Sequence, residues 1–322
     1  MALTNPSDLV VVITGCDSGF GAEIAEELYN REGFTIYATC LTEKGVEKYN
    51  ALQSPRVKAI QLDVTNQDDV NRLRTKVEAE CPQGVYCVVN NAGIFGGGFF
   101  DFASEDSFQK LMDINFMGTV RIIKAMLPSL RAYARLRHEA KSNAMPRARL
   151  LSISSVAGRS NPPGHGGYSA SKHALESIMD TLRVELSPWE IDVSTIEPFY
   201  AKTPLVADMH TIFERAWRTS DIYFQKMYGP SFVEGVRKHS EALHDFSMPS
   251  KWVTDAVVDA IMKKNGARKA HNLVGFWWVG IVIRIHDTMP TWMTDFSVKL
   301  LLKGLGVVPS DPFLLAKSGK EE

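Results

Sequence analysis

Residues 9–21, Leu-Val-Val-Val-Ile-Thr-Gly-Cys-Asp-Ser-Gly-Phe-Gly, decide the fold. The run at 9–14 is apolar up to its last residue, as in a strand that is covered on both faces of a parallel sheet. A glycine-rich turn follows, and the helical spacing of Ile24, Ala25 and Leu28 begins directly after it. A strand, a glycine turn and a helix in this order place backbone amides and a helix N-terminus where a pyrophosphate can bind.

The glycines of this turn are Gly15, Gly19 and Gly21, which is not the common G-x-G-x-x-G spacing. A tight turn between a strand and a helix that binds no ligand is therefore the alternative. The position of the turn directly after the first strand favours nucleotide binding.

Strand and helix patterns alternate along the following chain. Further strands are expected at 34–39, 57–62, 85–89, 150–153 and 191–196, and helical patterns lie between them at 46–52, 66–77, 105–127 and 168–186. This alternation predicts a parallel sheet with helices on both faces and right-handed crossovers. The expected fold class is α/β, with a single Rossmann-like doubly wound parallel sheet and a helical substrate lid.

The proposed lid is the segment 204–248, where large apolar side chains are interleaved with charges. The segment is too long for an ordinary loop, so we expect helices over the strand ends, followed by a further helix at 252–262. Residues 270–322 are interpreted as an apolar C-terminal extension. Since no linker divides the sequence, 1–322 is expected to form one domain, with 9–203 as its cofactor-binding and catalytic core.

The composition argues against several classes of protein. Lys and Arg number 36 and Asp and Glu 37, a net charge of -1 that does not indicate a nucleic-acid partner. The four cysteines, at positions 16, 40, 81 and 87, show no Cys-x-x-Cys spacing and indicate reduced structural thiols. The eight histidines are scattered, and no metal site is expected.

No signal peptide or membrane-spanning segment is expected. Residues 1–8 are short and polar, and the apolar run at 273–285 contains Arg284 and is shorter than the roughly 18 residues that cross a bilayer. We therefore expect a cytoplasmic protein with possible peripheral membrane contact. The basic segment 131–149 is interpreted as a helix extension and a surface loop, with contact to an anionic membrane surface as the alternative.

The candidate catalytic side chains are Ser155, Tyr168 and Lys172. The strand at 150–153 leads into Ser155, whose hydroxyl can hydrogen-bond a substrate oxygen. Tyr168 and Lys172 lie four residues apart on a predicted helix and share a face. An ammonium near a phenol lowers the phenol pKa from about 10, which suits an acid/base at neutral pH. The alternative is an ordinary turn followed by a solvated helix face.

Together these residues resemble the short-chain dehydrogenase/reductase superfamily over residues 9 to about 205. The motifs follow the order and spacing of the family: Thr-Gly-x-x-x-Gly-x-Gly at 14–21, Asp63-Val64, Asn-Asn-Ala-Gly at 90–93, Asn115, Ser155, Tyr168-x-x-x-Lys172, and Pro198 with Thr203. Finer features are similar to the branch of retinol, hydroxysteroid and 3-hydroxybutyrate dehydrogenases: the run at 13–21, Cys-Leu-Thr-Glu-Lys-Gly at 40–45, Ser-Ser-Val-x-Gly-Arg at 154–159 and Pro-Thr-Trp from 290. Phe199 departs from the family, which usually has Gly there.

The resemblance implies a role for each matching residue. Tyr168 is expected to be the acid/base, Lys172 to lower its pKa and hold the nicotinamide ribose, and Ser155 to bind the substrate oxygen. Asn115 is expected to hold a water that connects Lys172 to solvent. The residues expected at the cofactor are Gly15, Asp17, Ser18, Gly19, Phe20, Gly21, Asp63, Val64, Asn90, Ala92, Gly93, Tyr168, Lys172 and Thr203. NAD is favoured, because no basic residue lies in the glycine turn or directly after the second strand; NADP is the alternative.

We therefore expect an oxidoreductase that transfers a hydride between a nicotinamide cofactor and an alcohol or carbonyl of an apolar substrate of the retinoid or steroid type. Part of the aromatic set in the lid is expected to line the pocket: Phe213, Trp217, Phe224, Met227, Tyr228 and Phe232.

Two other functions stay open. A dehydrogenase of a short hydroxy acid such as 3-hydroxybutyrate needs a cation in the pocket, for which the candidates are Lys202, Arg215, Arg218 and Lys226. A non-catalytic NAD(P)-binding sensor or scaffold has no need of the full catalytic set. By the same resemblance, the helices at about 105–128 and 168–187 are expected to pair between subunits of a homodimer or homotetramer.

Overall fold

The structure is a computed structural model that describes residues 9–141, 145–263 and 270–307. Its strands form one sheet in the order β3-β2-β1-β4-β5-β6-β7, and every neighbouring pair is parallel. The α/β doubly wound fold is therefore confirmed. The strands are β1 (Leu9–Ile13), β2 (Phe34–Cys40), β3 (Val57–Gln61), β4 (Cys87–Asn90), β5 (Arg149–Ile153), β6 (Asp192–Pro198) and β7 (His271–Val274).

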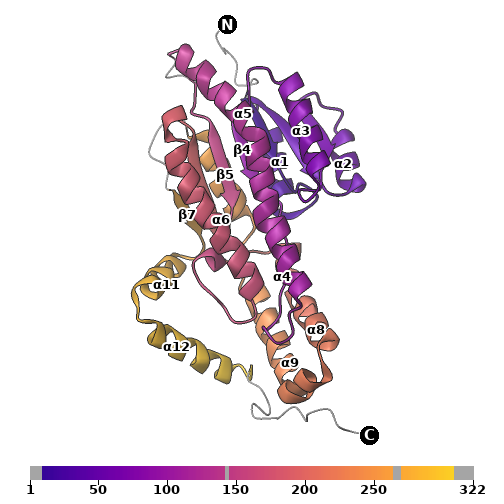
Figure 1. Cartoon of the computed structure of the whole chain (residues 1–322), viewed down its shortest axis with the longest axis vertical. Helices are drawn as coiled ribbons and strands as arrows, with labels where there is room; N and C mark the ends of the chain where they lie inside the picture. Colours follow the sequence, from indigo (N-terminus) through magenta and orange to yellow (C-terminus); the bar gives the residue numbers. More distant parts are fainter. Residues whose placement is uncertain (1–8, 142–144, 264–269, 308–322) are drawn as a thin grey trace.

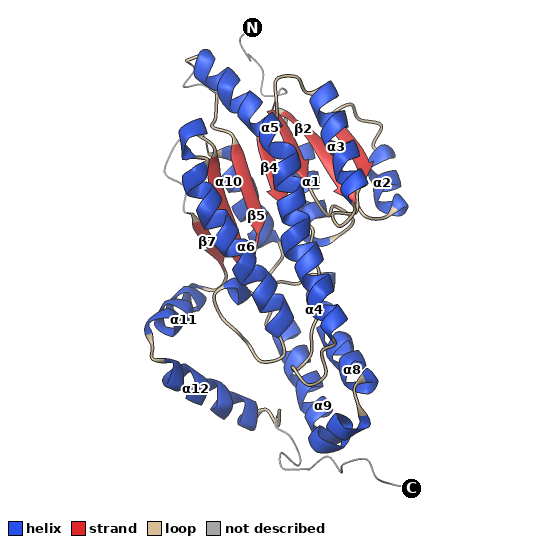
Figure 2. Cartoon of the chain, in the orientation of Figure 1, coloured by secondary structure: helices blue, strands red, loops and turns tan. Residues whose placement is uncertain are grey.

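Helices cover both faces of the sheet (Figures 1 and 2). Helices α3, α5 and α6 lie on the face turned toward the viewer, and α1 and α10 pack against each other on the opposite face. The helices are α1 (Gly19–Tyr29), α2 (Glu43–Asn50), α3 (Gln67–Glu80), α4 (Glu105–Leu111), α5 (Thr119–Glu139), α6 (Gly166–Glu185), α7 (Pro204–Ala207), α8 (Met209–Thr219), α9 (Ile222–Asp245), α10 (Lys251–Met262), α11 (Trp277–Thr288) and α12 (Thr291–Gly304), with short helical segments η2 (Met112–Gly118), η3 (Val156–Gly158) and η4 (Ser187–Trp189).

The hydrophobic core lies between the sheet and these helices. Val11, Val12 and Ile13 of β1 are fully buried, as are Ile24 and Leu28 of α1. Full burial of one such side chain contributes about 1.5–3 kcal/mol. Since β1 is an interior strand, between β2 and β4, its apolar run holds the following glycine turn in a fixed position.

Two elements differ from the sequence prediction. The helix expected at 105–127 is divided by a π-helical segment at Met112–Gly118, beyond which α5 continues to Glu139. Strand β7 was not predicted, because its residues are half-buried and His-Asn-Leu-Val is neither a continuous apolar run nor an alternating one. It pairs with β6 and forms an edge of the sheet.

The segment that follows β6 is helical and lies beyond the carboxyl ends of the strands (Figure 1). Helices α8 and α9 pack against each other around a second apolar cluster that includes Phe102, Phe213 and Phe232. Helices α11 and α12 form an arm that projects to one side of the molecule (Figure 1). Within the three described ranges, no helix combines the length and apolar character that crossing a bilayer requires.

Candidate functional site

A cavity of about 930 Å³ lies at the carboxyl ends of the strands. Most of the residues predicted for the site line it: Gly15, Asp17, Ser18, Gly19, Phe20, Asp63, Val64, Ala92, Gly93, Ser155, Tyr168, Lys172 and Thr203. Three others, Gly21, Asn90 and Asn115, are not part of its lining. The fold thus brings the predicted catalytic and cofactor residues to one place.

The glycine turn after β1 is shaped for a close ligand. Gly15 and Gly19 have positive φ angles of 71° and 57°, which favour glycine. A Cβ on Gly21 would lie 2.3 Å from the Gly15 carbonyl oxygen, whereas one on Gly19 would meet no atom within 4 Å. Helix α1 begins here without a side-chain cap from Ser18, so its first amides are available to an anion. The turn therefore fits a pyrophosphate group.

Two further residues hold this turn in place; both belong to motifs quoted from the sequence, but neither was given a role there. The Asn91 Nδ2 group donates to the carbonyl oxygens of Thr14 and Gly15, at 2.9 and 3.0 Å. The Thr14 hydroxyl accepts from the backbone amides of Asn91 and Ala92, both at 3.0 Å. These bonds join the ends of β1 and β4. The sequence signal for them was a polar residue at each of the two strand ends, Thr14 and Asn91.

The Asp17 carboxylate fixes the loop after β2. It accepts from the backbone amides of Leu41 and Thr42, at 2.7 and 3.0 Å, and from the Thr42 hydroxyl at 2.6 Å. The end of β2 is where dinucleotide-binding folds contact the adenosine ribose. A negative charge at this position suits a free ribose hydroxyl better than a 2′-phosphate.

Ser155, Tyr168 and Lys172 converge on the cavity as predicted. Ser155 follows β5 and caps η3, its Oγ accepting from the Ala157 amide at 3.1 Å. Tyr168 and Lys172 lie one turn apart on α6. The Lys172 Nζ atom is 5.7 Å from the centre of the Tyr168 ring and donates to the Ile153 carbonyl oxygen at 2.9 Å.

The protonation of Tyr168 differs from the expectation. Burial raises the pKa of Tyr168 to about 12, and the hydrogen bond from Ser155 only partly opposes this. Lys172 is directed at Ile153 rather than at the phenol oxygen, so the sequence-based expectation of a lowered pKa does not hold here. Burial also lowers the pKa of Lys172 to about 8. In this form Tyr168 is a protonated phenol at neutral pH.

Asn115 and Asn90 support the site from behind. The Asn115 side chain accepts from the Ile94 amide at 2.8 Å and donates to the Ile94 carbonyl and to the Ser171 hydroxyl, both at 3.0 Å. It lies in the π-helical segment and ties the loop after β4 to α6. Asn90 donates to the Ser152 hydroxyl at 3.1 Å, beneath the end of β5. The expected role of Asn115 in holding a water stays a prediction.

An aromatic wall beside Tyr168 was not predicted. The ring of Phe95 lies 5.2 Å from that of Tyr168 and 5.0 Å from that of His165. Burial lowers the pKa of His165 to about 4, so its imidazole is neutral at pH 7. Tyr200 bonds His165 Nε2 at 3.1 Å, and Phe199 packs on Tyr200 with ring centres 5.1 Å apart. This part of the cavity is therefore apolar and uncharged.

The aromatic residues expected from the lid do not line this cavity. The lid residues that reach it are Pro204, Leu205, Val206 and Met209. Phe213 and Phe232 are buried in the apolar cluster between α8, α9 and the loop after β4, with Trp217, Phe224 and Tyr228 packed against them. The helical spacing of these residues was predicted correctly, but their side chains pack within the lid.

Comparisons with known proteins agree with this geometry. Mitochondrial D-beta-hydroxybutyrate dehydrogenase of Mus musculus is 30% identical over 87% of this chain and 81% of its own length. Retinol dehydrogenase 16 of Homo sapiens is 34% identical over 75% of this chain and 73% of its own length. 11-beta-hydroxysteroid dehydrogenase type 2 of Bos taurus is 32% identical over 87% of this chain and 67% of its own length.

The fold has solved relatives as well. The crystal structure of a short chain dehydrogenase/reductase from Burkholderia phymatum in complex with NAD matches with a TM-score of 0.68 and 22% sequence identity, over 95% of this chain and 98% of that one. The short chain dehydrogenase family matches residues 9–211, which include the glycine turn, the catalytic group and the start of the lid. The chain therefore belongs to the short-chain dehydrogenase family of oxidoreductases.

Proposed function

We propose that this protein is a nicotinamide-dependent dehydrogenase of bulky apolar alcohols, or a reductase of the matching carbonyls. The observation that carries this proposal is the apolar wall beside Tyr168, formed by Phe95, Phe199 and Tyr200 together with the neutral His165. Ligand pockets are mostly apolar with a few polar anchors, and Ser155 and Tyr168 are in position to be those anchors.

The reaction assigns one task to each polar side chain. The bound cofactor supplies or accepts the hydride at the substrate carbon. In the reductive direction, Tyr168 Oη donates its proton to the carbonyl oxygen, and in the oxidative direction its phenolate takes the proton from the alcohol. The Ser155 hydroxyl holds that same oxygen, and Lys172 lies beside the Tyr168 ring, with its Nζ atom 5.7 Å from the ring centre. The raised pKa of Tyr168 keeps the phenol protonated, as reduction requires.

Asp17 supports NAD as the preferred cofactor. Its carboxylate lies against the backbone at the end of β2, where a 2′-phosphate would be repelled. Among the described residues that line the cavity, the cations are Lys110, at an exposed position of α4, and Lys172 in the catalytic group. Neither lies in the glycine turn or in the loop after β2. We expect kcat/KM for NAD to exceed that for NADP.

The short hydroxy acid is the second candidate, because D-beta-hydroxybutyrate dehydrogenase is among the similar proteins. A carboxylate in the pocket needs a cationic partner. The four residues considered as this cationic partner are all exposed and outside the cavity lining: Lys202, Arg215, Arg218 and Lys226. This placement favours the apolar substrate.

The test compares kcat/KM for a steroid or retinoid alcohol with that for 3-hydroxybutyrate, each with NAD and NADP. Each buried methylene contributes about 0.8 kcal/mol, so a pocket built for a large apolar substrate should discriminate by orders of magnitude. Preference for the short acid would refute the apolar-pocket proposal. Cofactor binding without turnover of any substrate would favour the non-catalytic sensor.

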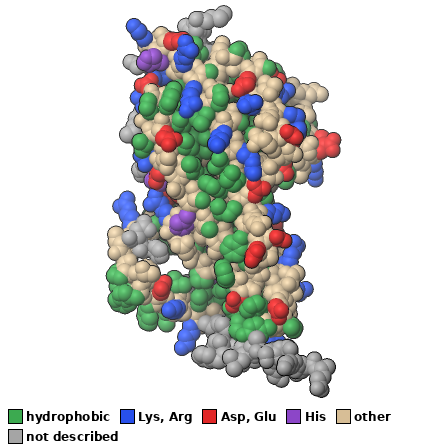
Figure 3. Space-filling view, in the orientation of Figure 1, with side chains coloured by type: hydrophobic (Ala, Val, Ile, Leu, Met, Phe, Trp, Pro, Cys, Tyr) green, Lys and Arg blue, Asp and Glu red, His purple; other side chains and the backbone are tan. Residues whose placement is uncertain are grey.

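Peripheral membrane contact belongs to the same proposal. Helices α11 and α12 expose Trp277, Trp292, Phe296 and Leu300, which are between 62% and 82% accessible. Apolar side chains are visible on this arm in Figure 3. Aromatic and aliphatic side chains of this kind bind the interface of a bilayer, from which apolar substrates partition. Sedimentation with phosphatidylcholine vesicles, compared between the wild type and Trp277→Ser/Trp292→Ser, tests this contact.

A further inference from the structure

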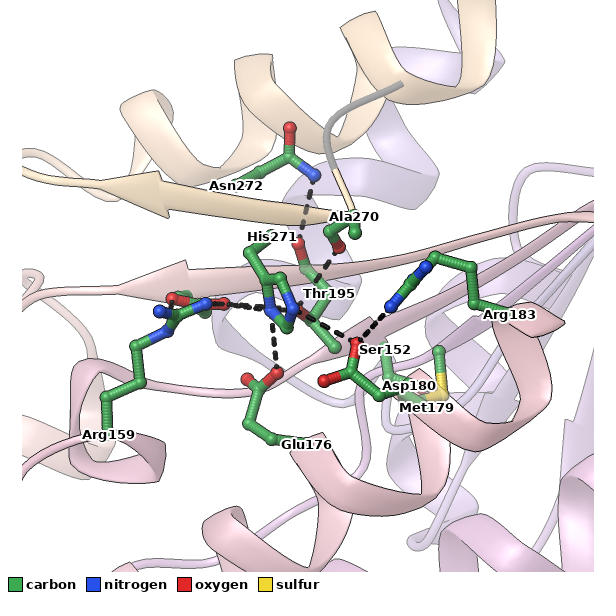
Figure 4. Close-up of polar contacts among 11 residues, drawn as sticks. Ser152, Arg159, Glu176, Met179, Asp180, Arg183, Thr195, Ala270, His271 and Asn272 are labelled. Carbon is green, nitrogen blue, oxygen red and sulfur yellow. Dashed lines mark hydrogen bonds and ion pairs between the residues drawn. The ribbon is translucent and has the colours of Figure 1, made fainter. Parts of the chain in front are cut away.

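A cluster of charged side chains lies between α6, β6 and β7 (Figure 4). Glu176 follows Lys172 by one turn of α6 and is only 7% exposed. Its carboxylate lies 3.2 Å from His271 Nδ1, and His271 comes from the edge strand β7. A residue of the catalytic helix is thus connected to the edge of the sheet.

His271 is held by carboxylates on both ring nitrogens. Its Nδ1 atom lies 2.8 Å from Glu197 Oε1, and its Nε2 atom lies 3.0 Å from Asp180 Oδ1. Carboxylate oxygens therefore face both edges of the imidazole ring. The Thr195 hydroxyl, 3.2 Å from Nδ1, also faces the ring.

Two arginines complete the cluster: Arg159 Nε pairs with Glu197 Oε2 at 2.7 Å, and Arg183 Nη2 pairs with Asp180 Oδ1 at 3.0 Å. Three carboxylates therefore meet two guanidinium groups and the His271 ring. Glu176, Glu197 and His271 also offer ligand atoms within 4.8 Å of one another, as a metal site would. The two guanidinium groups already pair with two of the three carboxylates, so we assign an ion-pair cluster here rather than a metal site.

Glu176 also contacts the loop that carries Ser155. A Cβ on Gly158 would lie 3.0 Å from Glu176 Cγ and 3.0 Å from Ser154 Oγ, so the glycine leaves room for the glutamate beside this loop. Burial raises the pKa of Glu176, and so does the charge of Glu197, while the Ser154 and Thr195 hydroxyls and the charge of His271 partly oppose this rise. The two hydroxyls and His271 thus limit the rise in pKa that burial imposes on this carboxyl.

We propose that Glu176, held by His271, is a positioning residue that sustains the positive charge on Lys172 and so sets the pH range in which Tyr168 and Lys172 work. Lys172 is 6% exposed, and its hydrogen-bond acceptor is the neutral Ile153 carbonyl. Burial lowers the pKa of this lysine to about 8, and the negative charge of Glu176 acts in the opposite direction. Asn115, on the other side, offers no charge. This inference rests on the proposed function of Lys172 as the partner of Tyr168.

The two residues should act in the same direction. Removal of the Glu176 charge leaves burial unopposed at Lys172 and lowers its pKa. Removal of the His271 charge lets Glu176 take up a proton more readily, which weakens the same support. Loss of His271 should therefore give a smaller shift than loss of Glu176, and the double variant should not exceed the glutamate variant.

The first test measures Lys172 directly and needs no substrate. Competitive acetylation of the full chain by acetic anhydride at a series of pH values, followed by mass spectrometry of the Lys172 peptide, gives the pH midpoint of its amine. We expect Glu176→Gln to lower this midpoint by about one unit, which is about tenfold in the protonation equilibrium, and His271→Gln to lower it less. Glu185→Gln, an exposed position on the same helix, and His138→Gln, an exposed histidine on α5, should leave it unchanged.

The second test records kcat/KM against pH for the same variants. The alkaline limb of the profile should move to lower pH in Glu176→Gln, and Glu176→Asp, which keeps the charge, should restore most of the wild-type profile. Equal loss of activity at every pH, with an unchanged acetylation midpoint, would show a purely structural role and overturn the inference. An equivalent of Zn²⁺ bound at the cluster and lost in Glu176→Gln would overturn it as well. Failure of all apolar substrates would reject the proposed function and leave the acetylation result decisive for the charge of Lys172.

Discussion

Two phenols in the cavity should separate catalysis from stability when each is changed to phenylalanine. Tyr168 hydrogen-bonds Ser155, and Tyr200 bonds the buried His165 at 3.1 Å. The His165 Nδ1 atom faces the Pro163 carbonyl at 3.2 Å and must therefore carry the proton of the neutral ring. His165 Nε2 is then an acceptor, and the Tyr200 hydroxyl is its donor.

The expected magnitudes follow from these partners. Tyr168→Phe removes the acid/base, which typically contributes about 10²–10⁴ in rate, or about 2.7–5.5 kcal/mol of activation free energy. It removes one hydrogen bond to Ser155, so the free energy of unfolding should fall by only about 0.5–1.5 kcal/mol. Tyr200→Phe leaves the buried His165 acceptor without its donor, which costs about 1–3 kcal/mol of stability. Its kcat should stay within about tenfold of the wild type, because its hydroxyl takes no proton from the substrate.

The assay follows the absorbance of the reduced nicotinamide with a steroid or retinoid alcohol, and urea denaturation measures stability in parallel. Tyr168→Phe should lose more activity than Tyr200→Phe, and Tyr200→Phe should lose more stability than Tyr168→Phe. The reasoning is refuted if Tyr168→Phe keeps more than about a tenth of the wild-type kcat, or if both variants lose activity in proportion to their loss of stability.

Three further outcomes are expected. Gly21→Ala places a Cβ 2.3 Å from the Gly15 carbonyl oxygen and should weaken NADH binding measured by fluorescence. Gly166→Ala, whose Cβ would meet no atom within 4 Å, should leave the affinity unchanged. Equal affinities of the two variants would contradict the proposed fit to the pyrophosphate. The pKa of His165 is lowered to about 4, so between about pH 6.5 and pH 4 the unfolded chain binds a proton that the folded chain does not, and stability should fall by about 3 kcal/mol as the pH falls. His165→Gln should flatten this slope in urea denaturation and the exposed His138→Gln should not; parallel slopes would exclude His165 as the cause. Light scattering at micromolar concentration should show a homodimer or homotetramer paired through α5 and α6, which lie side by side on the face where apolar side chains gather in Figure 3; a monomer would reject the pairing.

The sheet and the cofactor side of the site could be predicted because both depend on local sequence. The apolar runs end within a few residues of the ends of the observed strands. A residue that follows a strand in the sequence necessarily lies at the carboxyl end of that strand. Parallel strands bring those ends to one edge, so Gly15, Asp63, Gly93 and Ser155 line one cavity without any knowledge of side-chain packing.

The missed features depend on contacts between distant parts of the chain. The π-helical segment was invisible as a pattern, because it accompanies the bonds from Asn115 to Ile94 and Ser171, which only the folded chain brings together. The aromatic wall was missed for a related reason. Phe95, His165 and Tyr200 lie in three separate loops, and none of them belongs to a periodic run.

The protonation of Tyr168 shows why the spacing of Tyr168 and Lys172 was insufficient. Four residues along a helix place both side chains on one face, but the ammonium can then be directed at either the phenol or another acceptor. In this structure Lys172 donates to the carbonyl at the end of β5, and burial decides both pKa values. The charge that opposes burial at Lys172 comes from Glu176, one turn further along α6, and Glu176 is held in turn by β7, the strand that the sequence did not reveal. The acid/base pair is therefore a local motif, whereas the pH at which it operates is a property of the assembled sheet.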